Sequence, residues 1–186
     1  MSMPYFSDVI YQGLAELEPG KYEYCAFQAC DFKQLDLSEI AFWECTFDEC
    51  DLSNADIRDA DFRDVAFRSC KLLGIDFSTT KDFLFSVYFE KCQLDYANFT
   101  GKQMPHTPFT DCSLKEADFT QASLSQATFS NCELHRTIFE QTNLEKADFR
   151  TASNFIIDPE NNILKKARFS GTNLSGLLKK YNLDIE

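Results

Sequence analysis

Large apolar side chains recur at every fifth position along most of the chain, and polar residues fill most of the positions between them. The series runs through residues 17–77, slips by two residues, continues through 84–149 and closes, after a gap, at 164–174. A period of five fits neither the 3.6-residue period of a helix nor the two-residue period of a strand. It is typical of a solenoid, in which short strands alternate with turns and stacked coils bury the large residues together.

The positions around each large residue follow a pattern of their own. The residue two before it is mostly Ala, Cys or Thr, and Asp or Asn often stands just before it, as in segments 55–59 (ADIRD) and 147–151 (ADFRT). This A-(D/N)-(L/F)-x-x pattern resembles the pentapeptide-repeat family, and the match covers nearly the whole chain. The resemblance implies an all-β solenoid, a right-handed quadrilateral (square) parallel β-helix with four pentapeptides to each coil, to which we add a short C-terminal helical cap.

We expect the β-helix to cover residues 1–174 and a C-terminal helix and tail to cover 175–186. Residues 1–14 would form an N-terminal lead-in strand or cap, built on Phe6, Val9 and Ile10. In the implied coil, large residues of one type stack on opposite sides. The predicted columns are Phe89, Phe109, Phe129, Phe149 and Phe169 on one side, and Phe99, Phe119 and Phe139 on the opposite side.

Three stretches break the repeat, at residues 78–83, 101–106 and 153–162, and we expect surface loops there. After residue 174 the remaining apolar side chains exceed what an end cap needs. The family resemblance implies a twofold homodimer through this segment, and a monomer with a folded-back cap is the alternative. The candidate cap and dimer residues are Leu177, Leu178, Tyr181, Leu183 and Ile185.

The cysteines all occupy the small-residue position of the repeat. In the implied coil, residues 20 apart stack with Cβ atoms about 4.8 Å apart, beyond the roughly 3.5–4.5 Å that a disulfide prefers. The Cys-x4-Cys pairs 25/30 and 45/50 have no His near them and lie on adjacent sides that serve the core, so we expect no metal site and interpret the cysteines as small core hydrophobes. They are Cys25, Cys30, Cys45, Cys50, Cys70, Cys92, Cys112 and Cys132.

The formal net charge of −12 argues against direct binding to nucleic acid or to an anionic membrane. No stretch approaches the roughly 20 apolar residues of a membrane span, and the N-terminus does not resemble a secretory signal, so we expect a cytoplasmic protein. Catalysis finds little support, because His106 and His135 stand alone and no phosphate-binding or nucleophile motif is present. We predict no enzyme activity and no cofactor.

The negative charge is concentrated in residues 1–100, which hold 19 acidic and 8 basic residues. One side of the coil displays seven acids against the single base Arg58, which favours a partner-binding face. The alternative is that Asp beside a large residue only ties its own turn. The acidic-face residues are Glu16, Glu18, Asp36, Glu39, Asp56, Asp59 and Asp76.

An adjacent side presents Trp43, Arg63 and Phe85 in one outward column, with Phe83 nearby. Exposed aromatic residues in a row are typical of a partner contact, although Phe83 and Phe85 have the alternative of tucking under the slip in the repeat.

Within the family, the chain is most similar to the quinolone-resistance (Qnr-type) proteins in its length, its nearly uninterrupted coil, its acidic surface and the Leu-Leu-x-x-Tyr segment at 177–181. This resemblance implies a DNA-like rod that binds type II topoisomerase (DNA gyrase or topoisomerase IV) and displaces DNA or protects the enzyme from fluoroquinolones. The chain lacks a long inserted loop, which weakens the expectation of drug protection more than that of binding. A generic interaction rod with another protein partner is the alternative.

Overall fold

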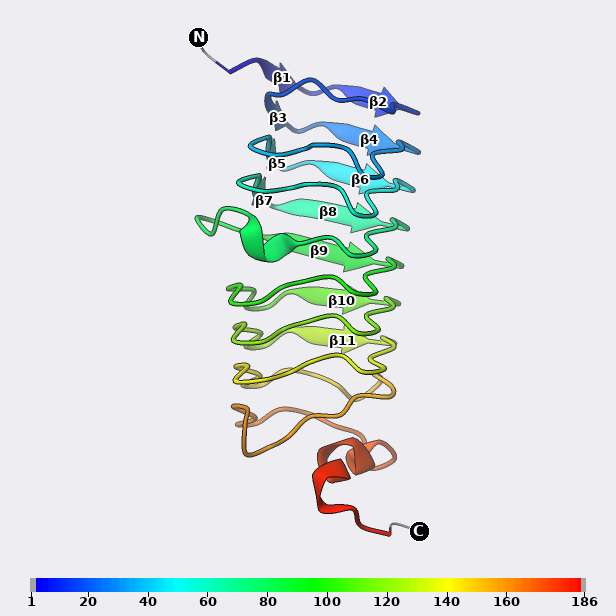
Figure 1. Cartoon of the computed structure of the whole chain (residues 1–186), viewed down its shortest axis with the longest axis vertical. Helices are drawn as coiled ribbons and strands as arrows, with labels where there is room; N and C mark the ends of the chain where they lie inside the picture. Colours follow the sequence, from blue (N-terminus) through cyan, green and yellow to red (C-terminus); the bar gives the residue numbers. More distant parts are fainter. Residues whose placement is uncertain (1–2, 185–186) are drawn as a thin grey trace.

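The computed structural model describes residues 3–184, and in them the chain winds into a parallel β-solenoid with its two ends at opposite poles (Figure 1). Two parallel sheets run along it, one in the order β1-β3-β5-β7 and one in the order β11-β10-β9-β8-β6-β4-β2. The strands are β1 (Tyr5–Ser7), β2 (Ile10–Gln12), β3 (Lys21–Glu23), β4 (Ala26–Gln28), β5 (Ala41–Trp43), β6 (Thr46–Asp48), β7 (Asp61–Arg63), β8 (Val65–Arg68), β9 (Val87–Glu90), β10 (Pro108–Thr110) and β11 (Thr128–Ser130).

Most paired residues are 20 positions apart, as in Tyr22↔Phe42, and isolated bridges such as Asp36↔Asp56 extend the same spacing to the sides without strands. The coil of 20 residues is thus confirmed, whereas the square outline and the right-handed turn stay predictions. Short 3-10 helices make up the rest of the regular structure: η1 (Phe77–Thr79), η2 (Leu174–Leu177) and η3 (Lys179–Tyr181).

The chain turns its corners with residues in the left-handed region. The residue two after a large residue repeatedly has a φ near +50° to +64°, as in Glu39 (61°) and Asp59 (56°). A side chain in this region costs about 1–2 kcal/mol. Residues other than Gly accept that cost here because most corner N–H groups donate to a carbonyl of the next coil, as Glu39 N does to Arg58 O (2.9 Å).

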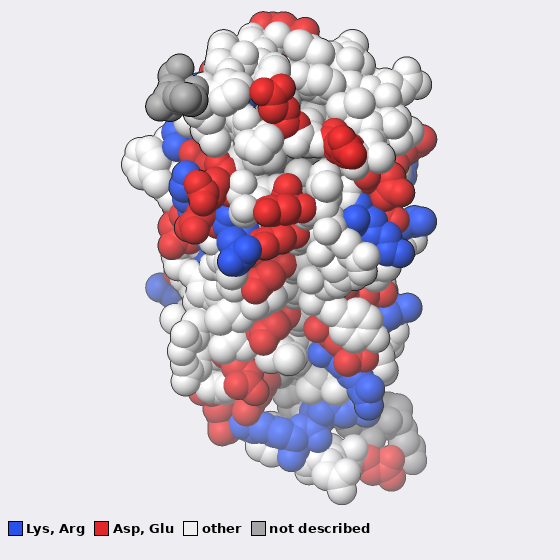
Figure 2. Space-filling model, turned by 45° about the horizontal axis from the view of Figure 1, so that its top comes forward, with Lys and Arg blue, Asp and Glu red and all other residues white. Residues whose placement is uncertain are grey.

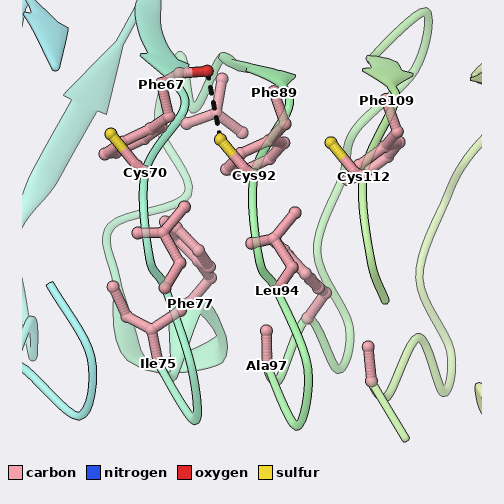
Figure 3. Packing of buried hydrophobic residues seen from close by; sticks show 14 of the residues in the cluster. Phe67, Cys70, Ile75, Phe77, Phe89, Cys92, Leu94, Ala97, Phe109 and Cys112 are labelled. Atoms are coloured by element: carbon pink, nitrogen blue, oxygen red, sulfur yellow. Dashed lines mark hydrogen bonds between the residues drawn. The ribbon is translucent and has the colours of Figure 1, made fainter. Parts of the chain in front are cut away.

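Aromatic rings stack along the core as predicted. A continuous column on the β11–β2 sheet has ring centroids 4.6–5.5 Å apart (Figure 3). It comprises Phe27, Phe47, Phe67, Phe89, Phe109, Phe129, Phe149 and Phe169. The second predicted column is also present, since Phe99 stacks on Phe119 and Phe119 on Phe139.

All eight cysteines are buried free thiols, as predicted. A thiol typically donates to the carbonyl of the large residue one coil earlier, as Cys92 Sγ does to Phe67 O at 3.4 Å (Figure 3). Thr137 fills the same position and donates to Leu114 O at 2.7 Å, which explains why Cys and Thr share this slot. Burial raises the pKa of the Cys45 thiol to about 12, so it stays protonated at neutral pH.

Several positions differ from the simple five-residue series. Leu84, expected in the core, is exposed with a φ of +59°, because it occupies a corner rather than a strand. Leu174, also expected in the core, starts η2 and is exposed. In the gap of the repeat, Phe155 and Ile157 are buried instead.

The N-terminal segment forms a further coil that the series misses. Tyr5 pairs with Lys21, an offset of 16 rather than 20, so the five-residue phase is lost between them. Phe6 stacks on Tyr22 and Tyr11 on Phe27. The expectation that Val9 and Ile10 face the core is wrong, because both are exposed.

Candidate functional site

The predicted acidic face divides into two kinds of carboxylate. Asp36, Asp56 and Asp76 each accept a hydrogen bond from the backbone N–H two residues on, at 3.0–3.1 Å. Hydrogen bonds from Ser38 and from Arg58 hold the pKa of Asp36 and Asp56, respectively, below its usual value. These three side chains therefore stabilise their own turns, which agrees with the alternative that Asp beside a large residue has a structural role.

The other four acids of this face are free. Within residues 3–184, the side chains of Glu16, Glu18, Glu39 and Asp59 are exposed, with no hydrogen bond and no ion pair. Acidic side chains also form a line along the rod in Figure 2, and basic side chains gather near its C-terminal end. The free carboxylates, rather than the turn-tying ones, are available to a partner.

A ladder of alternating aromatic and cationic side chains runs along the outside of the β1-β3-β5-β7 sheet. Lys21 Nζ lies 3.3 Å from the ring centroid of Trp43 and 5.3 Å from that of Tyr5. The Arg63 guanidinium lies 4.0 Å from the Trp43 ring and 5.3 Å from the Phe83 ring. Four of these residues come from successive coils and Phe83 from the loop that follows them, and they form one stack because cations favour the faces of aromatic rings.

Both cations of this ladder are neutralised locally. Lys21 Nζ lies 3.0 Å from Glu23 Oε2. Arg63 Nε donates to the buried Asp61 at 2.8 Å. The indole N–H of Trp43 is buried and has no hydrogen-bond partner within residues 3–184, so the ring is held by packing and by its two cation contacts, without a hydrogen bond.

Residues 80–86, here named the junction loop, project from the rod after η1 and before β9 (Figure 1). Phe83 is 70% exposed, whereas Phe85 is half-buried and meets the core residue Phe77 edge-on at 6.1 Å. Phe83 is therefore exposed, as expected for a partner contact, whereas Phe85 tucks under the loop, as the alternative predicted. The predicted outward column ends in Phe83 instead of Phe85.

The C-terminal residues pack only in part against the solenoid. Leu177 is half-buried against the core, and Gly176 approaches Phe155 so closely that a Cβ would collide with its carbonyl oxygen. Tyr181 donates to Glu160 at 2.8 Å. The remaining candidates are Leu178, which is half-buried, Leu183, which is exposed, and Ile185, which lies outside the described residues.

Residues 3–184 hold no group of three or more His, Cys, Asp or Glu side chains that would bind a metal ion. His106 has a polar neighbour in Gln126, whose Nε2 lies 3.5 Å from its ring Nε2. None of the helices described is long and apolar enough to span a membrane.

Comparison with known proteins agrees with this architecture. Residues 21–99 match the profile of a pentapeptide repeat region, and residues 112–150 match that of pentapeptide repeats in eight copies. No curated protein sequence matches the chain significantly.

Solved structures similar over nearly the full length include two of QnrB1. Full-length QnrB1, a plasmid-mediated fluoroquinolone resistance protein, is 20% identical with a TM-score of 0.66, over 97% of this chain and 100% of QnrB1. A trypsin-treated variant of QnrB1 is 20% identical with a TM-score of 0.63, over 100% of this chain and 99% of the variant. The five-residue repeat, the parallel solenoid and both profiles lead to one conclusion: the chain belongs to the pentapeptide-repeat family.

Proposed function

We propose that this protein is a non-enzymatic rod that imitates the charge of duplex DNA and binds a type II topoisomerase, DNA gyrase or topoisomerase IV. The observation that carries the proposal is the set of free carboxylates on the N-terminal coils, Glu16, Glu18, Glu39 and Asp59. The Qnr-type resemblance of the sequence and the similarity in fold to QnrB1 support the choice of partner.

The charge density supports this reading quantitatively. Residues 1–100 carry 19 acidic and 8 basic residues, and at 20 residues per coil they fill about five coils, or about 24 Å of rod. That is one net negative charge per roughly 2 Å, close to the spacing of roughly 1.7 Å along duplex DNA. Residues 101–186 hold 11 acidic and 10 basic residues and have no such density. The N-terminal coils are therefore the part proposed to enter a DNA-binding groove.

The rod acts in the cytoplasm, where topoisomerases work, and binds protein rather than nucleic acid. A homodimer through Leu178, Tyr181 and Leu183 would double the length of the rod. Binding in this way would protect the enzyme from fluoroquinolones, which the ciprofloxacin arm of the test below measures.

A generic interaction rod is the second candidate function, and the cation–aromatic ladder around Trp43 favours it. Salt distinguishes the two candidates. Binding through free carboxylates should weaken steeply between about 50 and 200 mM salt, whereas a contact dominated by aromatic burial should change little.

The test is a gyrase supercoiling assay with the purified protein titrated in, with and without ciprofloxacin. The double variant Glu39→Lys/Asp59→Lys should weaken the effect at least about tenfold, because it reverses two free charges. The fold should tolerate Lys at these corners, since Lys91, Lys146 and Lys166 already adopt the same left-handed conformation.

A matched control makes the same charge change on the weakly charged half. Asp111→Lys/Glu116→Lys also replaces two corner acids, both with positive φ, and should leave the effect within about twofold. Unlike Glu39 and Asp59, these acids have partners, since Asp111 accepts a hydrogen bond from Asn131 (3.0 Å) and Glu116 lies 3.9 Å from Arg136, so urea unfolding is used to show that the control variant is folded. If the protein has no effect on gyrase or topoisomerase IV, or if both double variants lose it equally, the DNA-imitation proposal is wrong.

A further inference from the structure

The junction loop is fastened by a lysine that points into the solenoid. Lys102 is only 1% exposed, and its Nζ donates to Thr80 O at 2.6 Å and to Asp82 Oδ1 at 2.7 Å. Its Nζ also lies 4.9 Å from the ring centroid of Phe85. A buried ammonium persists only where it is paired and hydrogen-bonded. These contacts hold the start and the end of the loop, so the surface that the loop builds is preformed.

A cavity of about 400 Å³ opens between this loop and the cation–aromatic ladder. Its apolar walls are the Trp43 ring, Leu84 and Phe85. Leu84 is 62% exposed, and its neighbour Phe83 is more exposed still. A single exposed apolar side chain is ordinary, but two in sequence beside an apolar hollow mark a contact site.

The polar rim of this cavity carries uncompensated negative charge. Arg63 is engaged by Asp61, so its charge is already balanced. Glu44 makes no ion pair within residues 3–184. Asp64, likewise without a cationic partner there, accepts hydrogen bonds from the hydroxyls of Ser86 and Tyr88, both at 3.0 Å. The rim also belongs to the strongly acidic half of the rod, so complementarity requires a cationic occupant.

We infer that this cavity binds one large apolar side chain of a partner protein, presented in a segment whose neighbouring residues are Lys or Arg. The apolar side chain fills the space between the Trp43 ring and Leu84, and the flanking cations face Glu44 and Asp64. The inference rests on the proposed role as a protein-binding rod and names the chemistry of one contact.

The protein carries its own reporter for this cavity, because Trp43 is its one tryptophan. Three blocked peptides serve as probes: Lys-Lys-Phe-Lys-Lys, Lys-Lys-Ala-Lys-Lys and Glu-Glu-Phe-Glu-Glu. Titration of the first should shift the Trp43 fluorescence saturably. The second should bind about tenfold more weakly, because it lacks the side chain that fills the cavity. The third should produce no saturable shift, because the rim repels it.

Two variants test the location. Leu84→Ala removes one wall and should weaken binding of the Lys-Lys-Phe-Lys-Lys peptide several-fold, while the control Ile163→Ala, at a similarly exposed residue on the other half, should not. Ser86→Phe, which fills the cavity from its rim, should abolish the shift. Equal binding of the Phe and Ala peptides, or unchanged binding to both Leu84→Ala and Ser86→Phe, would overturn the inference.

The outcome is separable from that of the proposed function. If the peptide binds at Trp43 but the protein has no effect on gyrase or topoisomerase IV, the cavity assignment stands and the topoisomerase role fails. If gyrase responds but the peptide does not bind, the topoisomerase role stands and the cavity assignment fails.

Discussion

The coils before and after the junction loop use the same repeat but pack their aromatic rings differently. Before it, Tyr22, Phe42 and Phe62 stack on the β1-β3-β5-β7 sheet, next to the continuous Phe column. After it, the second stack is that of Phe99, Phe119 and Phe139, which meets the continuous column edge-on. The second aromatic column thus changes sides in the middle of the rod.

Phe77 marks the point of change. It meets Phe62 of the old stack at 5.9 Å and stacks on Phe99 of the new one at 4.9 Å. The old stack has no successor to Phe62, because Leu84 turns outward and Phe85 and Lys102 fill the space. The loop therefore lies where the second aromatic column moves from one side of the solenoid to another. The cavity beside Trp43 lies at this change of packing.

The largest expected effect concerns the column that both halves share. Phe47→Ala before the junction and Phe109→Ala after it should each lower the free energy of unfolding by about 3–5 kcal/mol, because each leaves a cavity between stacked rings. Urea unfolding measures this loss. Similar losses would show that the column is uniform across the junction, and a loss below about 1 kcal/mol for either variant would contradict this picture.

A smaller effect is expected at the junction itself. Lys102→Met keeps the apolar stem but leaves the carbonyl of Thr80 without its partner, which should cost about 1–3 kcal/mol. Hydrogen exchange of residues 80–86 should accelerate at the same time. Lys115→Met, at an exposed lysine, is the matched control and should change neither quantity. Unchanged exchange in Lys102→Met would show that Lys102 does not fasten the loop.

The smallest effect concerns the pH dependence of one buried thiol before the junction, that of Cys45. The column of Cys25 and Cys45 exists only before the junction, since Val87, Ala127 and Ala147 occupy the corresponding positions after it. Burial raises the pKa of the Cys45 thiol to about 12 in the folded state. Its stabilisation is fully present below the unfolded-state pKa, near 8.5–9, and is lost as pH rises from there toward 12.

Between pH 9 and 10, Cys45 should therefore account for about 1 kcal/mol of lost stability. Urea unfolding of Cys45→Thr checks this, since Thr already fills the same slot at positions 137 and 142. The variant should lose less stability over this pH range than the unchanged protein. An identical loss in both would show that Cys45 does not titrate as described.

Much of the fold was predictable because the repeat is local. The position of a residue within its five-residue unit predicts whether its side chain faces the core, so the spacing predicted the stacked Phe columns and the buried thiols. A lead-in strand built on Phe6 was expected in residues 1–14, but the register of this first coil was not, because its offset of 16 breaks the five-residue phase. Which carboxylates stabilise turns could be read in part from the repeat, because Asp36 stands directly before a large residue whereas Asp59 stands two positions after one. Which of the acids remain free of hydrogen bonds and ion pairs needed the structure.

The sequence by itself determined the solenoid, its period, its inward-facing residues and its family, because these depend on a pattern repeated within five residues. The tertiary structure alone decided how coils 20 or more residues apart meet. It placed Lys21, Trp43 and Arg63 in one stack, turned Leu84 outward and buried Lys102 beneath the loop. Such contacts depend on the register between coils, and a two-residue slip at the junction resets that register for everything packed around it.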